Sequence, residues 1–221
     1  MKLLLSALSK FIFGLLFVGL LLFIPAGTIH FHNAWLFIVL LFVPILILGI
    51  VLFIKSPDLL KKRLNAKEKE KTQKSVVGIS ALLFLLGFIV AGLDYRFKLS
   101  TVPKYVVIIA SVILLISYAL YAEVMRENVY LSRTIEVQEN QKVIDKGLYK
   151  IVRHPMYAVT IWLFLSIPLV LGSWYSFICF IPYIPIIAIR IINEEKVLEN
   201  ELDGYTDYKK RTKYRLIPFI W

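Results

Sequence analysis

Four long stretches of this sequence contain no Asp, Glu, Lys or Arg. They cover residues 11–54, 75–93, 105–122 and 155–189. A helix needs roughly 18 to 20 apolar residues to cross the hydrocarbon core of a bilayer, and each stretch reaches that length. The first and the last are long enough for two crossings each. The sequence therefore predicts an all-α, polytopic membrane helix bundle with about six transmembrane helices.

Local signals predict where the two longest stretches reverse. The first is expected to break around residues 30–33, giving helices near 11–29 and 34–54. The last contains Pro168 and Gly172-Ser173, which favour a tight reversal over one continuous helix. The last two helices are therefore predicted to form a hairpin.

The basic residues indicate how such a bundle is oriented. With six crossings, all Lys and Arg residues except Arg96, Lys98 and Lys104 lie on one side, together with both termini. Because Lys and Arg accumulate in cytoplasmic loops, both termini are predicted to be cytoplasmic. A cleaved signal peptide within residues 1–28 is the alternative, but its apolar part is long and it lacks a small-x-small cleavage site. The net charge of +11 then follows from topology, and no nucleic-acid partner is expected.

The most basic loop, residues 55–74, carries eight basic and three acidic residues. We interpret it as an anchor on anionic lipid headgroups. The single cysteine, Cys179, lies inside an apolar stretch, so neither a disulfide framework nor a cysteine-based metal site is expected.

Two other segments on the same side are almost neutral but rich in charges of both signs. In the first of them, residues 123–154, the fourth span is expected to continue as a helix around residues 117–135, with Glu123 and Arg126 as an i,i+3 pair. An irregular stretch from Thr134 to Lys146 is expected to follow. Residues 190–221 follow the last span. We therefore divide the chain into N-terminal transmembrane helices with the basic loop, residues 1–122, and a candidate catalytic region, residues 123–221.

Each charge-balanced segment contains a candidate site. Pro155 suits the first position of a helix, which places Arg153 and His154 at the membrane boundary, where free backbone N–H groups favour an anion. In the last segment Arg190 and Glu194 are four residues apart and share a helix face, whereas Glu195 is rotated by about 100°. One carboxylate is thus expected to face a site and the other to face away. This helix is expected to end near Gly204.

These motifs occur in a recognisable order. Gly147-x-Tyr149, Arg153-His154-Pro155-x-Tyr157, a helical hairpin, Arg190 followed by Glu194-Glu195, and Gly204-Tyr205-x-x-Tyr208 together resemble the isoprenylcysteine carboxyl methyltransferase and phospholipid methyltransferase family of integral membrane methyltransferases. Departures are Gln141, Leu148 and Val159, where members commonly have His, Pro and Gly.

The resemblance implies a methyltransferase that uses S-adenosylmethionine. Its acceptor would be a lipophilic small molecule or a lipid-anchored group, methylated on a carboxylate, a phospholipid amine or a thiol. Arg190 would orient the acceptor, and Glu195 or His154 would serve as a base if the acceptor is neutral. No metal is implied. The implied cofactor-binding residues are Gln138, Gln141, Val143, Ile144, Tyr149, His154, Pro155, Met156, Tyr157 and Glu194.

Two non-enzymatic interpretations compete with this one. A transporter is disfavoured because the predicted spans carry ionisable residues only at their boundaries. A scaffold that anchors a partner through residues 55–74 would leave Arg190 and Glu194 without a role.

Overall fold

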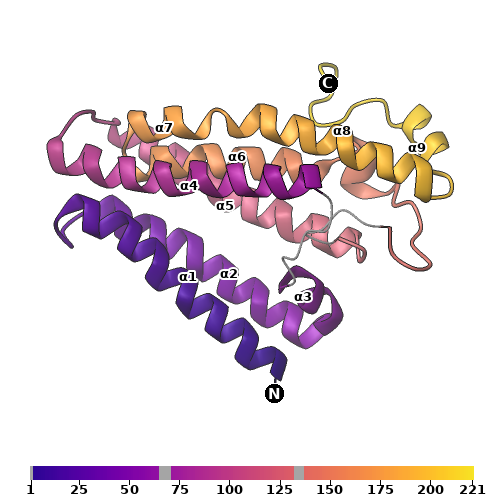
Figure 1. Cartoon of the computed structure of the whole chain (residues 1–221), viewed down its shortest axis with the longest axis horizontal. Helices are drawn as coiled ribbons and strands as arrows, with labels where there is room; N and C mark the ends of the chain where they lie inside the picture. Colours follow the sequence, from indigo (N-terminus) through magenta and orange to yellow (C-terminus); the bar gives the residue numbers. More distant parts are fainter. Residues whose placement is uncertain (1, 65–70, 132–136) are drawn as a thin grey trace.

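The computed structural model describes residues 2–64, 71–131 and 137–221, and within these ranges it contains helices and no strands (Figure 1). The predicted all-α class is confirmed. The elements are α1 (Lys2–Ala26), α2 (His32–Lys55), α3 (Pro57–Leu64), α4 (Lys71–Phe97), α5 (Lys104–Glu127), a 3-10 helix η1 (Gly147–Lys150), α6 (Pro155–Leu171), α7 (Trp174–Phe180), α8 (Tyr183–Glu201) and α9 (Tyr205–Arg211).

Five helical stretches of the described chain are long and apolar enough to cross a membrane, which supports a multi-pass membrane protein. They are Leu3–Ala26, His32–Lys55, Lys74–Phe97, Lys104–Glu127 and Trp174–Glu201. The remaining expected span is the shorter apolar helix α6, of 17 residues. The first helix starts at Lys2 rather than near residue 11. Lys10 lies inside this helix, and its ammonium donates to the carbonyl oxygen of Leu64 at 2.6 Å.

Tight turns join the helices at one end of the bundle. Gly172 ends α6 with φ +82°, and a Cβ at this position would lie 2.5 Å from the Asn33 side-chain nitrogen. Ser173 then caps α7, because its hydroxyl accepts a hydrogen bond from the Ser176 N–H. The reversal predicted at Gly172-Ser173 is therefore observed. The returning arm of the hairpin is divided between α7 and α8.

Helix α6 lies in the middle of the bundle. It packs along α5 and also contacts α2, α4, α7 and α8, while α1 packs along α4. The apolar core between these helices includes Leu22, Phe37, Phe88, Leu163 and Phe180, all buried. The first residues of α6 therefore lie at the centre of one end of the bundle.

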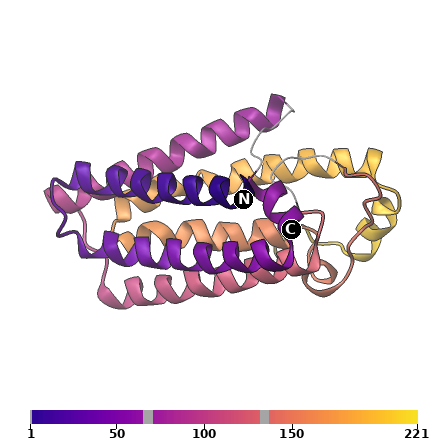
Figure 2. The same ribbon diagram turned by 90° about the horizontal axis from the view of Figure 1, so that it is seen from below.

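That end also gathers the irregular parts of the chain. Figures 1 and 2 both show α9 and the connection between α5 and α6 there, with the α1–α2, α4–α5 and α6–α7 turns at the opposite end. We call it the α9 end. Helix α8 stops at Glu201, close to where Gly204 was expected to end it. Gly204, with φ +81°, is instead the N-cap of α9, so its predicted role as a C-terminal cap was wrong.

Candidate functional site

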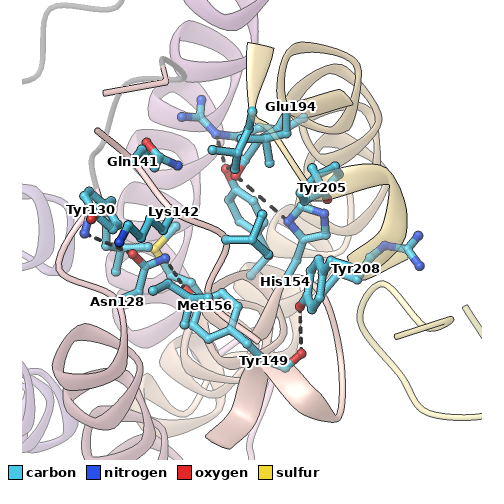
Figure 3. Close-up of a pocket in the computed structure, with 18 residues that line it drawn as sticks. Asn128, Tyr130, Gln141, Lys142, Tyr149, His154, Met156, Glu194, Tyr205 and Tyr208 are labelled. Carbon is cyan, nitrogen blue, oxygen red and sulfur yellow. Dashed lines mark hydrogen bonds and ion pairs between the residues drawn. The ribbon is translucent and has the colours of Figure 1, made fainter. Parts of the chain in front are cut away.

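A pocket opens at the α9 end of the bundle (Figure 3). Its empty space, including open solvent at the mouth, is about 850 Å³. The pocket is lined by the residues that follow α5, the irregular segment after residue 137, η1, and parts of α6, α8 and α9. The lining residues are Asn128, Tyr130, Leu131, Gln141, Lys142, Val143, Ile144, Tyr149, Arg153, His154, Met156, Tyr157, Arg190, Glu194, Leu198, Leu202, Tyr205 and Tyr208.

One wall of the pocket carries a carboxylate held by a tyrosine. The Tyr157 hydroxyl donates to Glu194 Oε2 at 2.5 Å and accepts from Arg190 Nε at 2.9 Å. His154 Nδ1 lies 4.0 Å from Glu194 Oε1. Arg190 is 9% exposed. Glu194 therefore places a negative charge in the pocket, and Tyr157 fixes the orientation of both Glu194 and Arg190.

The neighbouring carboxylate points elsewhere. Glu195 is 2% exposed and does not line the pocket. It accepts hydrogen bonds from Arg153 Nε at 2.7 Å and Arg215 Nε at 2.8 Å, and it lies 3.2 Å from His154 Nε2. The expectation that one carboxylate faces a site and the other faces away therefore agrees with this geometry. Three donors already surround Glu195, which leaves it poorly placed to accept a proton from a substrate.

Arg153 extends this cluster into the C-terminal segment. Its guanidinium also donates to the carbonyl oxygens of Thr212 and Lys213, at 2.8 and 2.7 Å. Backbone hydrogen bonds join the same two segments, because the Arg153 N–H donates to the Tyr214 carbonyl and the His154 N–H donates to the Arg215 carbonyl. The segment after α9 thus holds the start of α6, and with it His154, in place.

A sharp turn before η1 positions the opposite wall. Gly147 has φ +54°, and a Cβ there would lie 1.5 Å from Glu127 Oε1. The Glu127 carboxylate instead accepts the Leu148 N–H at 2.9 Å. Next to it, the Asn128 amide donates to the Tyr149 hydroxyl at 2.9 Å. Glycine suits this turn, because a Cβ would strain the positive φ and displace the Glu127 carboxylate, and the turn directs Tyr149 into the pocket.

The irregular segment of this wall is organised by Gln138. Its side-chain amide donates to the Tyr130 carbonyl at 2.5 Å, and its backbone N–H donates to Gln141 Oε1 at 2.9 Å. Gln138 itself does not line the pocket. Its neighbours at 132–136 lie outside the described residues, so the predicted course of the chain from Thr134 stays a prediction there.

Helix α3, in the most basic loop, contacts this wall. Lys62 Nζ donates to Gln138 Oε1 at 2.5 Å, and Arg63 contacts the Tyr121 hydroxyl and, at 4.0 Å, the sulfur of Met156. The sequence predicts only a lipid anchor for residues 55–74. The described part of this loop, which excludes 65–70, also supports the pocket wall.

Two tyrosines of α9 close the pocket. The Tyr208 hydroxyl donates to the Tyr149 carbonyl at 2.7 Å. Tyr205 is 4% exposed, and within the described ranges its hydroxyl is a buried side-chain atom without a hydrogen-bond partner. Burial raises the pKa of both hydroxyls, and the charges of Glu195 and Glu194 raise the pKa of Tyr205 further. Both hydroxyls therefore stay protonated and able to donate.

The structure brings most of the sequence-predicted site residues together. Those that line the pocket are Gln141, Val143, Ile144, Tyr149, His154, Met156, Tyr157, Glu194 and Arg190. Gln138, Pro155 and Glu195 do not line it but contact residues that do, or are adjacent to them in the chain.

Sequence reasoning had not selected the other half of the lining. Leu198 and Leu202 follow Glu194 at steps of four, so the helical repeat could have found them. Tyr205 and Tyr208 belong to the Gly-Tyr-x-x-Tyr motif, for which the resemblance implies no role in the site. Arg153 belongs to the Arg-His-Pro motif, which indicates it in the sequence. No comparable signal indicated the remaining residues, which are Asn128, Tyr130, Leu131 and Lys142.

A second cavity, of about 1110 Å³, lies at the opposite end of the bundle. Asp94 lines it, but this carboxylate already accepts from the Ser100 N–H and hydroxyl at 2.7 and 2.6 Å and from the Ser173 hydroxyl. The hydrogen bonds of Asp94 thus connect the α4–α5 turn with the α6–α7 turn. The candidate site is the smaller pocket, where Glu194 and His154 line the cavity.

Comparison with known protein families agrees with this choice. Residues 99–203 match the family described as phospholipid methyltransferase. This part of the chain, slightly less than half of it, is similar to that family of membrane methyltransferases. The resemblance seen in the motifs is therefore confirmed. No curated protein matches the chain.

The phospholipid methyltransferase region runs from before α5 to just beyond α8. It contains the Arg-His-Pro motif and the paired carboxylates. Tyr205 and Tyr208 lie beyond it, and α3 precedes it. Residues beyond the matched region thus line part of the pocket, and α3, which precedes the region, contacts its wall. The predicted boundary at residues 122 and 123 remains a prediction.

Proposed function

We propose that this protein is a membrane methyltransferase that binds S-adenosylmethionine in the pocket at the α9 end and transfers its methyl group to a lipophilic acceptor. One observation carries the proposal. Motif residues from three separate segments, around Tyr149, His154 and Glu194, converge on one pocket inside a region of a methyltransferase family.

The pocket suits a ligand that is cationic at one end. S-Adenosylmethionine carries a sulfonium and an ammonium group, and the Glu194 carboxylate would hold this positive end. His154 and Tyr157 would orient it, because both contact or approach Glu194. Gln141, Val143, Ile144, Tyr149 and Met156 would surround the rest of the cofactor. Gln138 and Pro155 would act indirectly, by fixing the wall segment and the start of α6.

Methyl transfer from a sulfonium depends more on the alignment of the nucleophile with the methyl carbon than on acid or base catalysis. The nucleophile attacks the methyl carbon in line with the carbon–sulfur bond, and the sulfur leaves as a neutral thioether. When the nucleophile is an anion, opposite charges are neutralised, so a dry site that fixes the geometry accelerates the reaction.

The acceptor would reach the pocket from the bilayer. Arg190 lies where the apolar part of α8 meets the pocket, and its guanidinium would orient an anionic group such as a carboxylate or a phosphate. A neutral amine or thiol would need a base. His154 is better placed than Glu195, because His154 lines the pocket whereas Glu195 is surrounded by donors. The distribution of Lys and Arg supports a cytoplasmic position for the site.

The first test is calorimetric binding of S-adenosylhomocysteine, the demethylated cofactor, to the purified protein in detergent. We expect binding by the wild type and weaker binding by His154→Ala and Glu194→Ala. The proposal fails if the wild type does not bind.

The second test is turnover. Transfer of labelled methyl to total lipid, prenylcysteine analogues and small thiols would identify the acceptor class. Arg190→Ala is expected to lose turnover more than cofactor affinity. The opposite pattern would mean that Arg190 belongs to the cofactor site.

A further inference from the structure

The Tyr205 hydroxyl differs from the other tyrosine hydroxyls around the pocket. Tyr208 donates to the Tyr149 carbonyl, Tyr157 donates to Glu194, and Tyr149 accepts from Asn128. Tyr205 is as buried as these side chains, yet its hydroxyl has no partner among the described residues. A buried hydroxyl without a partner costs free energy, so native proteins rarely leave one unless something else binds it.

Its position indicates what it would bind. Tyr205 lines the pocket, and Figure 3 shows it on the same side as Glu194 and His154, away from Tyr130 and Lys142. It therefore lies next to the wall that carries the negative charge. A ligand group held at this wall would be within reach of both the Glu194 carboxylate and the Tyr205 hydroxyl.

An α-amino acid group has the matching chemistry. Its ammonium and its carboxylate are attached to the same carbon, so a site that holds the ammonium with a carboxylate also has to offer a hydrogen-bond donor close by. Burial and the neighbouring carboxylates keep the Tyr205 hydroxyl protonated. It is then a donor for the ligand's carboxylate at neutral pH.

We propose that Tyr205 is a cofactor-binding residue whose hydroxyl donates a hydrogen bond to the carboxylate of the cofactor's amino-acid end, beside the ammonium held by Glu194. This assignment rests on the proposed function. It places a specificity determinant in α9, outside the region that matches the methyltransferase family.

The test compares two ligands and two variants. S-Adenosylhomocysteine carries the amino-acid end, whereas 5′-methylthioadenosine has the same nucleoside without it. Tyr205→Phe removes only the hydroxyl and keeps the ring. Tyr208→Phe is the matched control, because it makes the same change in the same helix but removes a hydroxyl that donates to the Tyr149 carbonyl.

We expect Tyr205→Phe to weaken S-adenosylhomocysteine binding about 10- to 100-fold, as for a hydrogen bond to a charged group. Its affinity for 5′-methylthioadenosine should equal that of the wild type, and its unfolding temperature should not fall. Tyr208→Phe should lower the unfolding temperature and should reduce the affinity for both ligands by the same factor.

The proposal is overturned if Tyr205→Phe binds S-adenosylhomocysteine as the wild type does. It is also overturned if Tyr205→Phe loses affinity for both ligands equally, because the hydroxyl would then contact the nucleoside or support the packing of α9. Failure of the wild type to bind either ligand would refute the proposed function itself.

Discussion

Glu194 and Glu195 are adjacent in the chain, but their surroundings predict opposite consequences when each is replaced by glutamine. Glu195 accepts from Arg153 and His154 through Oε1 and from Arg215 through Oε2. A glutamine has one accepting oxygen, so in either orientation its NH₂ group faces a donor. The variant also loses the negative charge that balances the two guanidinium groups.

The size of the effect follows from these contacts. Removing one partner of a buried ion pair costs about 3 to 5 kcal/mol, and glutamine keeps part of the hydrogen bonding. We therefore expect Glu195→Gln to lower the free energy of unfolding by about 3 kcal/mol, a factor of roughly 100 in the folded-to-unfolded ratio.

Glu194→Gln should behave differently. Its oxygen can still accept from the Tyr157 hydroxyl, so the free energy of unfolding should change by less than about 1 kcal/mol. The charge facing the pocket is lost, and the affinity for S-adenosylhomocysteine should fall about tenfold or more.

Unfolding in detergent and calorimetric titration of both variants would measure these effects. The reasoning is refuted if Glu195→Gln unfolds at the wild-type midpoint, or if Glu194→Gln loses as much stability as Glu195→Gln.

Two further predictions concern the wall around Tyr149. Gly147→Ala is expected to cost about 2 kcal/mol of stability, because the new Cβ collides with Glu127 and the residue has a positive φ. Gly49 has open space around it, so Gly49→Ala should leave the midpoint of thermal unfolding unchanged or raise it. Equal tolerance of alanine at both sites would contradict this prediction. Lys62→Ala removes a hydrogen bond to the pocket wall and should weaken S-adenosylhomocysteine binding roughly fivefold, about 1 kcal/mol. Lys61 is exposed on the same helix, so calorimetry should show no loss of affinity for Lys61→Ala. Similar losses of affinity in both variants would mean that only the net charge matters.

Local signals in the sequence explain how much of the fold could be predicted. The charge-free stretches predict the membrane helices because a bilayer imposes their length. Pro155 and Gly172 predict the start and end of α6, since each suits a backbone conformation that few other residues favour. The 100° step between neighbouring helical residues separates Glu194 from Glu195.

The rest of the site depends on contacts between distant parts of the chain. The helical step alone does not tell which of the two carboxylates faces the pocket, because the partners of Glu195 come from residues 153, 154 and 215. The contact between Lys62 and Gln138 joins segments with no shared pattern. That the Tyr205 hydroxyl lacks a partner is a property of the packed structure.

The pairing of Arg153 and His154 with the backbone of residues 214 and 215 also sets an order of events during biosynthesis. The two segments lie about sixty residues apart in the chain, with the whole helical hairpin and α9 between them. The ribosome must therefore have synthesised residue 215, and α6 to α8 must have inserted, before His154 can be held in its final position.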